Sequence, residues 1–536
     1  MSSLAPVAPG PGPPRLHRAG AAAAVCLGLF ILGLDLTVLN VAVPDLQSDL
    51  APTTAQVQWT VDAYALVLGG TVLALGAFTD RWGRRRSFLC GLAVCAAAST
   101  AGALATTPGQ VITARCVMGA GAALLMPATL AVLHHLYPEP ALRRRAISAW
   151  AAIGGLGGLS GPVVGGWLVE HFSWRAGFWI NLPLAAVAMT LALALVPESR
   201  STQRSTFDLP GAALSAGSLL SLVWAVTESP HRGWTSGATL TAFAAAALLL
   251  AAFLTRQRRI PHPMLPPALL RRPGVGTGAA ALALMSFAMF GALFVLTLYL
   301  QGVLGYSPLQ AGVRTLPLPG GLAVGAVAAV PLAARLGHKP PIVGGLTVIT
   351  AGFVVLAGTG PDSAYPRNAV FQLIVGFGAG LVAAAATDLV MGAVPQDRAG
   401  LGSAVNDATR QIGSALGVAV QGSVLAAVFT SHLTDSLTRA HAPAHLIGIV
   451  GHSGLSAPAR AGEVPEAVRP LVVSAAREAF TDAMTVTAFT AGAVTALTAA
   501  ALFRYLPDRS PRAMPPDREA VGTGHAARSR ATGPGR

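Results

Sequence analysis

The chain has 536 residues, of which 53% are hydrophobic and only 11% are charged. Soluble domains carry about 25% charged residues, so this composition excludes an ordinary soluble protein. The formal net charge of +14 would suggest nucleic-acid binding in a soluble chain, but here the basic residues lie in short segments between long apolar blocks. That distribution is a topology signal, so we expect the lipid bilayer as a partner and no nucleic acid.

Each apolar block is long enough to cross a hydrocarbon layer of about 30 Å as a helix. The sequence therefore predicts an all-α integral membrane protein with about 14 transmembrane helices. The first block exceeds the apolar core of a signal peptide, so it is expected to stay as an uncleaved span. The predicted spans lie near residues 19–43, 57–79, 87–106, 109–133, 146–169, 177–196, 208–227, 236–255, 275–300, 309–335, 341–360, 368–394, 404–429 and 480–504.

An even number of spans places both termini on the same side of the membrane. With the N-terminus in the cytoplasm, the inside segments carry 26 of the 36 Lys and Arg residues and the outside loops carry 8. Because basic residues collect in cytoplasmic loops, both termini are predicted to be cytoplasmic. The arginine-rich and alanine-rich composition is typical of a GC-rich bacterial genome, so the expected location is the bacterial cytoplasmic (inner) membrane.

This pattern predicts five regions along the chain. They are a disordered cytoplasmic tail (1–18), an N-terminal six-helix bundle (19–200), a two-helix insert (201–274), a C-terminal six-helix bundle (275–505) and a second disordered cytoplasmic tail (506–536). The C-terminal bundle contains one long outside loop, residues 430–479. The sequence leaves open whether this loop is an ordered cap or a flexible excursion.

A weak internal repeat relates the two bundles. Arg115 in span four is followed by two glycines, and Gln372 in span twelve is followed by two glycines at the same spacing. A basic glycine-containing loop follows span two, and a degenerate copy around Gly337 follows span ten. Repeated halves are typical of secondary transporters, whose substrate site lies between them.

Two motifs carry a resemblance to a known family, the major facilitator superfamily. The loop after span two resembles the signature loop of that superfamily through Gly76, Asp80, Arg81, Gly83, Arg84 and Arg85. Span five resembles the glycine-proline motif of its exporters through Gly154, Gly158, Gly161, Pro162, Gly165 and Gly166. The residue-level alternatives are an ordinary basic topogenic loop and simple helix packing, respectively.

Span one, with Asp35 and Asn40, and the start of span two, from Trp59 to Tyr64, resemble the fourteen-span drug:proton antiporters of the EmrB/QacA type within that superfamily. The resemblance covers residues 20–505. It implies the major facilitator fold, two six-helix bundles plus a two-helix insert. It also implies that Asp80 faces a helix N-terminus of the opposite bundle and stabilises one access state.

Ionised side chains inside a membrane need a partner, a water-filled cavity or a function. Asp35 is the leading candidate for proton coupling, and the resemblance gives Arg115 an influence on proton uptake; its alternative role is a structural salt bridge. Asp62 and Asp407 are further proton-coupling candidates. Their alternatives are a carboxylate that caps span two, for Asp62, and a local pair with Arg410, for Asp407.

The only lysine, Lys339, is followed by Pro340, so no phosphate-binding loop is present and a proton gradient is the expected energy source. We expect no catalytic site, metal or cofactor. The predicted function is proton-driven efflux of small amphipathic, cationic drugs or antibiotics by a chain that works as a monomer. The alternatives are a narrow exporter of one natural product and an uptake transporter; an intramembrane enzyme is disfavoured because its motifs are missing.

Overall fold

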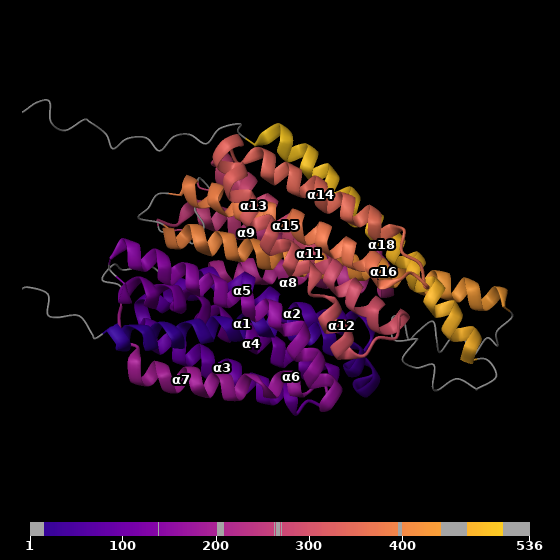
Figure 1. Ribbon diagram of the computed structural model, residues 1–536, viewed down its shortest axis with the longest axis horizontal. Coiled ribbons are helices and arrows are strands. Elements are labelled where there is room, and N and C mark those ends of the chain that lie inside the picture. Colours follow the sequence, from indigo (N-terminus) through magenta and orange to yellow (C-terminus); the bar gives the residue numbers. More distant parts are fainter. Residues whose placement is uncertain are drawn as a thin grey trace, which may run out of the picture.

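The computed structural model describes residues 15–506, except for 138, 201–207, 262, 264–268, 270, 395–398 and 441–468. The described part is helical throughout and contains no strand. Residues 1–14 and 507–536 of the two predicted tails, and the middle of the predicted outside loop, lie outside the described residues. The last four residues of the predicted N-terminal tail, 15–18, instead begin a helix. Figure 1 shows two groups of long helices side by side, one from each half of the chain.

The first group is the N-terminal half. Helix α1 lies along α5, helices α2 and α3 pack on α4, and α7 closes the group against α1 and α3. The helices are α1 (Arg15–Leu50), α2 (Thr54–Trp82), α3 (Arg84–Ala103), α4 (Pro108–Leu136), α5 (Pro140–His171), α6 (Ala176–Trp179) and α7 (Asn181–Leu195).

The second group is the C-terminal half, in which α11 packs on α16, and α15 packs on α13 and α14. Its elements are α11 (Pro273–Leu298), η1 (Tyr299–Val303), α12 (Pro308–Arg314), α13 (Pro317–Leu336), α14 (Lys339–Ala357), α15 (Tyr365–Ala393), α16 (Ala399–Arg439) and α18 (Arg469–Tyr505). Between the halves in sequence lie α8 (Leu209–Arg232) and α9 (Gly237–Arg259). Helix α8 packs on both α2 and α16, and α9 packs on α8.

Thirteen helical segments of the described chain are long and apolar enough to cross a membrane. Helix α2, which covers the second predicted span, is not one of the thirteen, although it packs within the N-terminal half. The prediction of an all-helical membrane protein is therefore confirmed, while the count of fourteen spans and the division into five regions stay predictions.

Two of the predicted spans are broken helices. Span ten is interrupted at Thr315 and Leu316, because Pro317 has no N–H to donate to the preceding turn. Span six begins as the short α6 and restarts at Asn181.

Two further helices are longer than predicted. Helix α16 continues to Arg439 and α18 begins at Arg469, so both ends of the predicted 430–479 loop are helical. Hydropathy does not predict these helix ends, because an amphipathic helix can extend beyond the membrane when its apolar face packs against another helix. Here Leu433 and Leu437 are buried in one apolar cluster with Val472.

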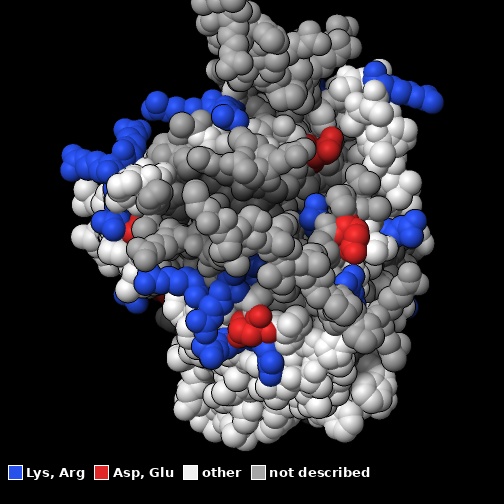
Figure 2. Space-filling model, turned by 90° about the vertical axis from the view of Figure 1, so that its left-hand side faces the viewer, with Lys and Arg blue, Asp and Glu red and all other residues white. Residues whose placement is uncertain are grey.

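The beginning of α1 and the end of α18 lie at the same end of the molecule (Figure 1). That end carries several basic helix termini, including Arg256 and Arg259 of α9 and Arg504 of α18. Figure 2 shows this face, where Lys and Arg side chains outnumber the acidic ones among the residues drawn in colour. We call it the basic end and the opposite one the outer end.

Candidate functional site

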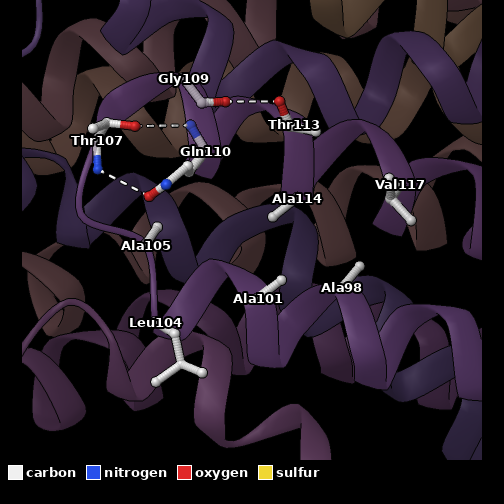
Figure 3. A pocket seen from close by; sticks show the side chains of 10 residues that line it. All are labelled: Ala98, Ala101, Leu104, Ala105, Thr107, Gly109, Gln110, Thr113, Ala114 and Val117. Carbon is white, nitrogen blue, oxygen red and sulfur yellow. Dashed lines mark hydrogen bonds between the residues drawn. The ribbon is translucent and has the colours of Figure 1, made fainter.

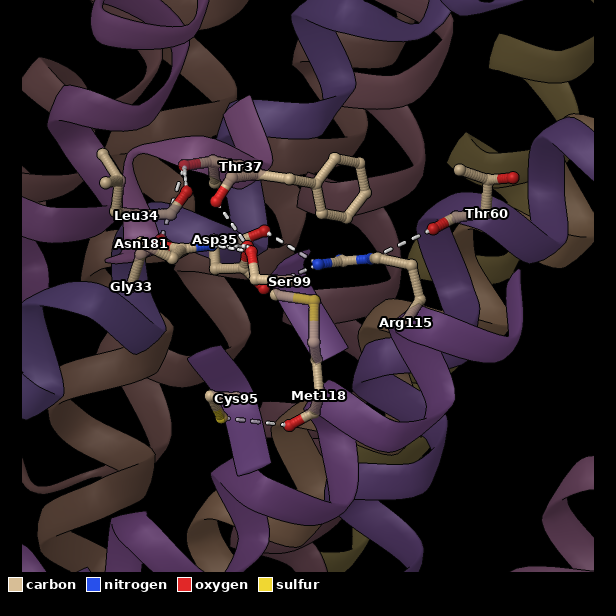
Figure 4. Close-up of polar contacts among 11 residues, drawn as sticks. Gly33, Leu34, Asp35, Thr37, Thr60, Cys95, Ser99, Arg115, Met118 and Asn181 are labelled. Carbon is tan, nitrogen blue, oxygen red and sulfur yellow. Dashed lines mark hydrogen bonds and ion pairs between the residues drawn. The ribbon is translucent and has the colours of Figure 1, made fainter. Parts of the chain in front are cut away.

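A buried ion pair joins α1 to α4 in the interior of the N-terminal half. Arg115 Nη1 lies 2.6 Å from Asp35 Oδ2, and the two residues are 1% and 3% exposed. The Arg115 Nε also donates to the Thr60 carbonyl of α2 at 3.2 Å (Figure 4). The guanidinium lies 4.6 Å from the ring centroid of Tyr64. The arrangement supplies the partner that each charge requires at this depth.

The second oxygen of Asp35 is held from α7. Asn181 Nδ2 donates to Asp35 Oδ1 at 3.1 Å and to Ser99 Oγ at 3.1 Å, and Ser99 Oγ donates to the Phe178 carbonyl at 2.7 Å. Five helices of the N-terminal half thus meet at one carboxylate: α1, α2, α3, α4 and α7. The sequence singled out Asp35 and Arg115 but missed the contact from Asn181, whose signal was the stretch Asn181-Leu182-Pro183 in span six, which resembles the family.

Asp62 lies apart from this pair, at the seam between the two halves. It is 2% exposed and its Oδ2 has no hydrogen-bond partner among the described residues. One turn before it, Gln58 lies against Gly422 of α16, and one turn after it, Leu66 is buried with Ala415. The alternative role of Asp62 as a helix cap is wrong, because the Thr53 side chain caps α2 instead.

Asp407 lies on the α16 side of the same seam, nearer the basic end. Its neighbour Ala408 is buried with residues of the N-terminal half, and Gln411 lies against Gly69 of α2. No ion pair within 4 Å joins Asp407 to Arg410 among the described residues, but the Arg410 charge acts on Asp407, so the local pair stays an alternative. Neither Asp62 nor Asp407 shares a hydrogen bond or ion pair with Asp35 or Arg115 in that part of the chain.

The signature loop is a tight turn between α2 and α3. Gly83 has a φ of +126°, and a Cβ there would lie 2.6 Å from a Glu198 carboxylate oxygen, so only glycine fits. That carboxylate accepts hydrogen bonds from the backbone N–H groups of Arg85 at 3.2 Å and Arg86 at 3.3 Å. Glu198 therefore neutralises the N-terminus of α3, a role that the sequence did not reveal.

Three other residues of the signature loop are placed by the structure, and the side chain of a fourth is not. Arg84 donates its backbone N–H to the Ser199 carbonyl at 3.0 Å, and Gly76 lies beside Pro127 of α4. Arg81 is exposed at the end of α2. The side chain of Asp80 lies outside the described residues, so its expected contact with the opposite half stays a prediction.

The exporter motif of α5 uses two faces. On one face, a Cβ at Gly165 would lie 2.7 Å from the Val38 carbonyl, and Gly154, Gly157 and Gly161 are similarly close to α1. Thr37 Oγ1 adds a hydrogen bond to the Gly158 carbonyl at 2.9 Å. The predicted ladder of small residues is thus a backbone-to-backbone contact between α5 and α1.

The other face of α5 meets the C-terminal half near the outer end. A Cβ at Gly166 would lie 2.5 Å from the Pro308 carbonyl, and a Cβ at Gly312 of α12 would collide with the Pro162 carbonyl. Glu170 then accepts a hydrogen bond from Ser307 Oγ at 2.7 Å. The glycines of the motif therefore serve both helix packing within the N-terminal half and a contact between the two halves.

A second glycine ladder, which the sequence did not reveal, lies in the C-terminal half. Gly413 and Gly417 of α16 place α16 directly against the carbonyls of Ala283 and Phe287 of α11. Their four-residue spacing, the same as in α5, was the available signal.

A groove of about 740 Å³ lies between α3 and α4 (Figure 3). Small and polar uncharged side chains line it, among them Ala98, Gly109 and Thr113, and the exposed Leu104 and Val117 mark its outward side. Because Ala114 faces the groove while the adjacent Arg115 faces the interior, the groove is separate from the ion pair. It contains no group that would recognise a charged ligand.

Comparisons with known proteins identify the family to which this chain belongs. The sequence model described as "Major Facilitator Superfamily" matches residues 25–418. The tetracenomycin C resistance and export protein of Streptomyces glaucescens is 32% identical over 94% of this chain and 95% of its own. The multidrug resistance protein Stp of Mycobacterium tuberculosis is 36% identical over 77% of each chain.

The fold agrees with solved transporter structures. A bacterial homologue of the human lysosomal transporter Spinster, in an inward-facing and unoccupied conformation, superposes with a TM-score of 0.65 at 16% identity, over 94% of this chain and all of the other. At that identity the similarity concerns the fold alone.

Proposed function

Since the chain belongs to the Major Facilitator Superfamily, we propose that it exports small amphipathic drugs or antibiotics across the cytoplasmic membrane, driven by the proton gradient. It is a transporter and not an enzyme. The relatives support export, because their names are those of resistance and efflux proteins, among them the multidrug efflux pump LfrA of Mycolicibacterium smegmatis, 32% identical over 90% of this chain. The observation that carries proton coupling is the buried Asp35–Arg115 pair.

The pair supports a proton step for an electrostatic reason. Asp35 is ionised while Arg115 lies 2.6 Å away, and taking up a proton removes the charge that holds the guanidinium. Arg115 keeps its hydrogen bonds to the Thr60 carbonyl of α2 and the Asp35 carbonyl of α1, but the attraction between the two side-chain charges is lost. Protonation therefore changes the contact between helices inside one half, which is the kind of change that can bias a rocking motion between two access states.

The described contacts between the two halves support the access state in which the outer side is closed. Several lie at the outer end: α5 against α12 at Gly166 and Gly312, the Glu170–Ser307 hydrogen bond, and α2 against α16 at Gln58. The halves also touch farther in, where Gly69 of α2 lies against Gln411 of α16. The contacts at the outer end close that side. Export then requires that these contacts separate after the drug has entered from the basic end.

We assign the drug a positive charge because two acids, Asp62 and Asp407, lie at the seam where the halves part. A carboxylate in a poorly screened environment attracts cations strongly. Asp407→Asn is then expected to weaken efflux of monovalent lipophilic cations more than efflux of neutral compounds. Equal loss for both kinds of compound would remove the support for a cation preference.

A second candidate function is a narrow exporter of one natural product. It is favoured by the full-length alignment with a protein named for tetracenomycin C, whereas the name of Stp indicates many substrates.

The orientation in the membrane belongs to the proposal as well: the basic end faces the cytoplasm, with both termini inside and the chain acting as a monomer. A cysteine at Arg439 should then be labelled from outside by an impermeant reagent, and one at Arg258 should not.

The central experiment measures efflux of a panel of dyes and antibiotics from cells that express the chain, with and without a protonophore. Protonophore-sensitive efflux of several unrelated compounds is the expected result. Efflux of a single compound would support the narrow exporter, and efflux that survives the protonophore would contradict the proton-driven mechanism.

A further inference from the structure

The Asn181 amide, at the start of α7, is bonded on one side only. Its Nδ2 donates to Asp35 Oδ1 and to Ser99 Oγ, each at 3.1 Å (Figure 4). Its Oδ1 is buried and has no hydrogen-bond partner among the described residues, and the whole residue is 2% exposed. Buried polar atoms are nearly always paired, so an unpaired one beside a candidate proton carrier calls for an explanation.

The present orientation of the amide suits only the ionised form of Asp35. A carboxylate accepts hydrogen bonds and donates none, so it matches the Asn181 N–H group. Asp35 Oδ2 faces the Arg115 guanidinium at 2.6 Å, and a guanidinium has donors only. A proton arriving at Asp35 must therefore sit on Oδ1, where it meets the donor side of Asn181 and finds no acceptor.

We propose that Asn181 is a positioning residue that reverses its amide when Asp35 takes up a proton, so that Asn181 Oδ1 accepts from the Asp35 hydroxyl. The inference rests on the proposed function, in which Asp35 carries the proton. One proton moves from water to Asp35 Oδ1, and no other covalent bond changes. The reversal takes Asn181 Nδ2 away from its two present acceptors, and the Ser99 hydroxyl turns from the Phe178 carbonyl to donate to Asn181 Oδ1.

The other described groups near Asp35 are less well placed to accept its proton. The titratable and charged groups that face it are Tyr64 from α2, Cys95 from α3 and Arg115 from α4. Arg115 only donates, and the Cys95 thiol already donates to the Met118 carbonyl at 3.4 Å. The Tyr64 hydroxyl can donate and accept and has no partner among the described residues, but no hydrogen bond joins it to Asp35, whereas Asn181 already bonds to Asp35 Oδ1.

The test uses the full-length protein with Asn181→Leu, which has nearly the same shape and no polar atom, and Asn181→Ser, whose hydroxyl donates and accepts directly or through a water. The infrared carbonyl band of a protonated carboxyl, absent in Asp35→Asn, marks the acid and alkaline ends of the Asp35 titration. We expect Asn181→Leu to lower Tm equally at both ends and to slow efflux about tenfold without changing KM, because each protonation state loses the bonds of Asn181 to Asp35 and to Ser99. Asn181→Ser should recover most of both losses.

Two outcomes overturn the inference. A loss of Tm confined to the alkaline end would make Asn181 a fixed donor to the carboxylate, and an unchanged Tm at both ends would remove its role. If Asn181→Leu fails to reach the membrane, Asn181→Ser decides alone: the same efflux pH profile as wild type supports a reversible partner, and a displaced profile contradicts it. Normal proton-driven efflux by Asp35→Asn would instead defeat the proposed function itself.

Discussion

The two halves build the same contact from different side chains. In the N-terminal half, Arg115 Nε donates to the Thr60 carbonyl at 3.2 Å, linking α4 to α2. In the C-terminal half, Gln372 Nε2 donates to the Arg314 carbonyl at 2.8 Å, linking α15 to α12. Gln372 occupies the place in the internal repeat that Arg115 occupies in the first half.

The difference lies in what surrounds the shared contact. Both carboxylate oxygens of Asp35 are paired in the N-terminal half. In the C-terminal half Gln372 Oε1 and both polar atoms of Asn368 have no hydrogen-bond partner among the described residues, and both residues are fully buried. The comparison teaches that the helix contact itself needs no charge. The charge pair in the first half is an addition to the scaffold, which is why we assign the proton step to that half.

The strongest test of the comparison makes the first half resemble the second. Arg115→Gln keeps a donor for Thr60 but leaves Asp35 without its cation. Removing one partner of a buried pair costs about 3–5 kcal/mol, so we expect a large fall in thermal stability and no proton-driven efflux. The measurements are Tm of the purified protein and efflux from inverted vesicles.

The double variant Asp35→Asn/Arg115→Gln separates stability from transport. With both charges removed, stability should return to within about 1 kcal/mol of wild type, because two neutral amides can satisfy each other. Efflux should stay absent. Efflux at the wild-type rate in the double variant would show that the pair is structural and that another acid carries the proton.

An intermediate effect is expected where the halves touch each other. Gly312→Ala places a methyl group against the Pro162 carbonyl and should slow efflux about tenfold, since closing the outer side costs roughly 1–3 kcal/mol more. The matched control is Gly320→Ala in α13, where a Cβ meets nothing within 4 Å. Equal rates for the two variants would argue against α5–α12 contact as the outer closure.

The smallest effect is expected in the neutral cluster of the C-terminal half. Gln372→Leu removes one hydrogen bond together with an oxygen that has no partner, and these changes nearly cancel. We expect a stability change below about 1 kcal/mol and an unchanged pH profile of efflux. A displaced pH profile would show that the C-terminal half takes part in the proton step.

The sequence predicted what depends on single spans. Length and charge gave the helices, and isolated charges in apolar segments gave Asp35 and Arg115. It could not predict which side chains from other spans reach them, because Asn181 and Glu198 are ordinary residues until the fold brings them to Asp35 and to Gly83. The glycines at positions 413 and 417 were overlooked because they lack the adjacent proline that makes the α5 motif conspicuous.

Helix α8 has a consequence for the energetics of every transport cycle. Leu219 and Val223 are buried with Leu66 of α2 and with Ala415 and Ala419 of α16, so the insert adheres to both moving bodies. Any rotation that separates α2 from α16 must also separate α8 from one of them, and this exposes the apolar cluster to lipid or drug. Exposing the cluster adds an apolar-surface cost to every separation of the halves, whichever compound is carried.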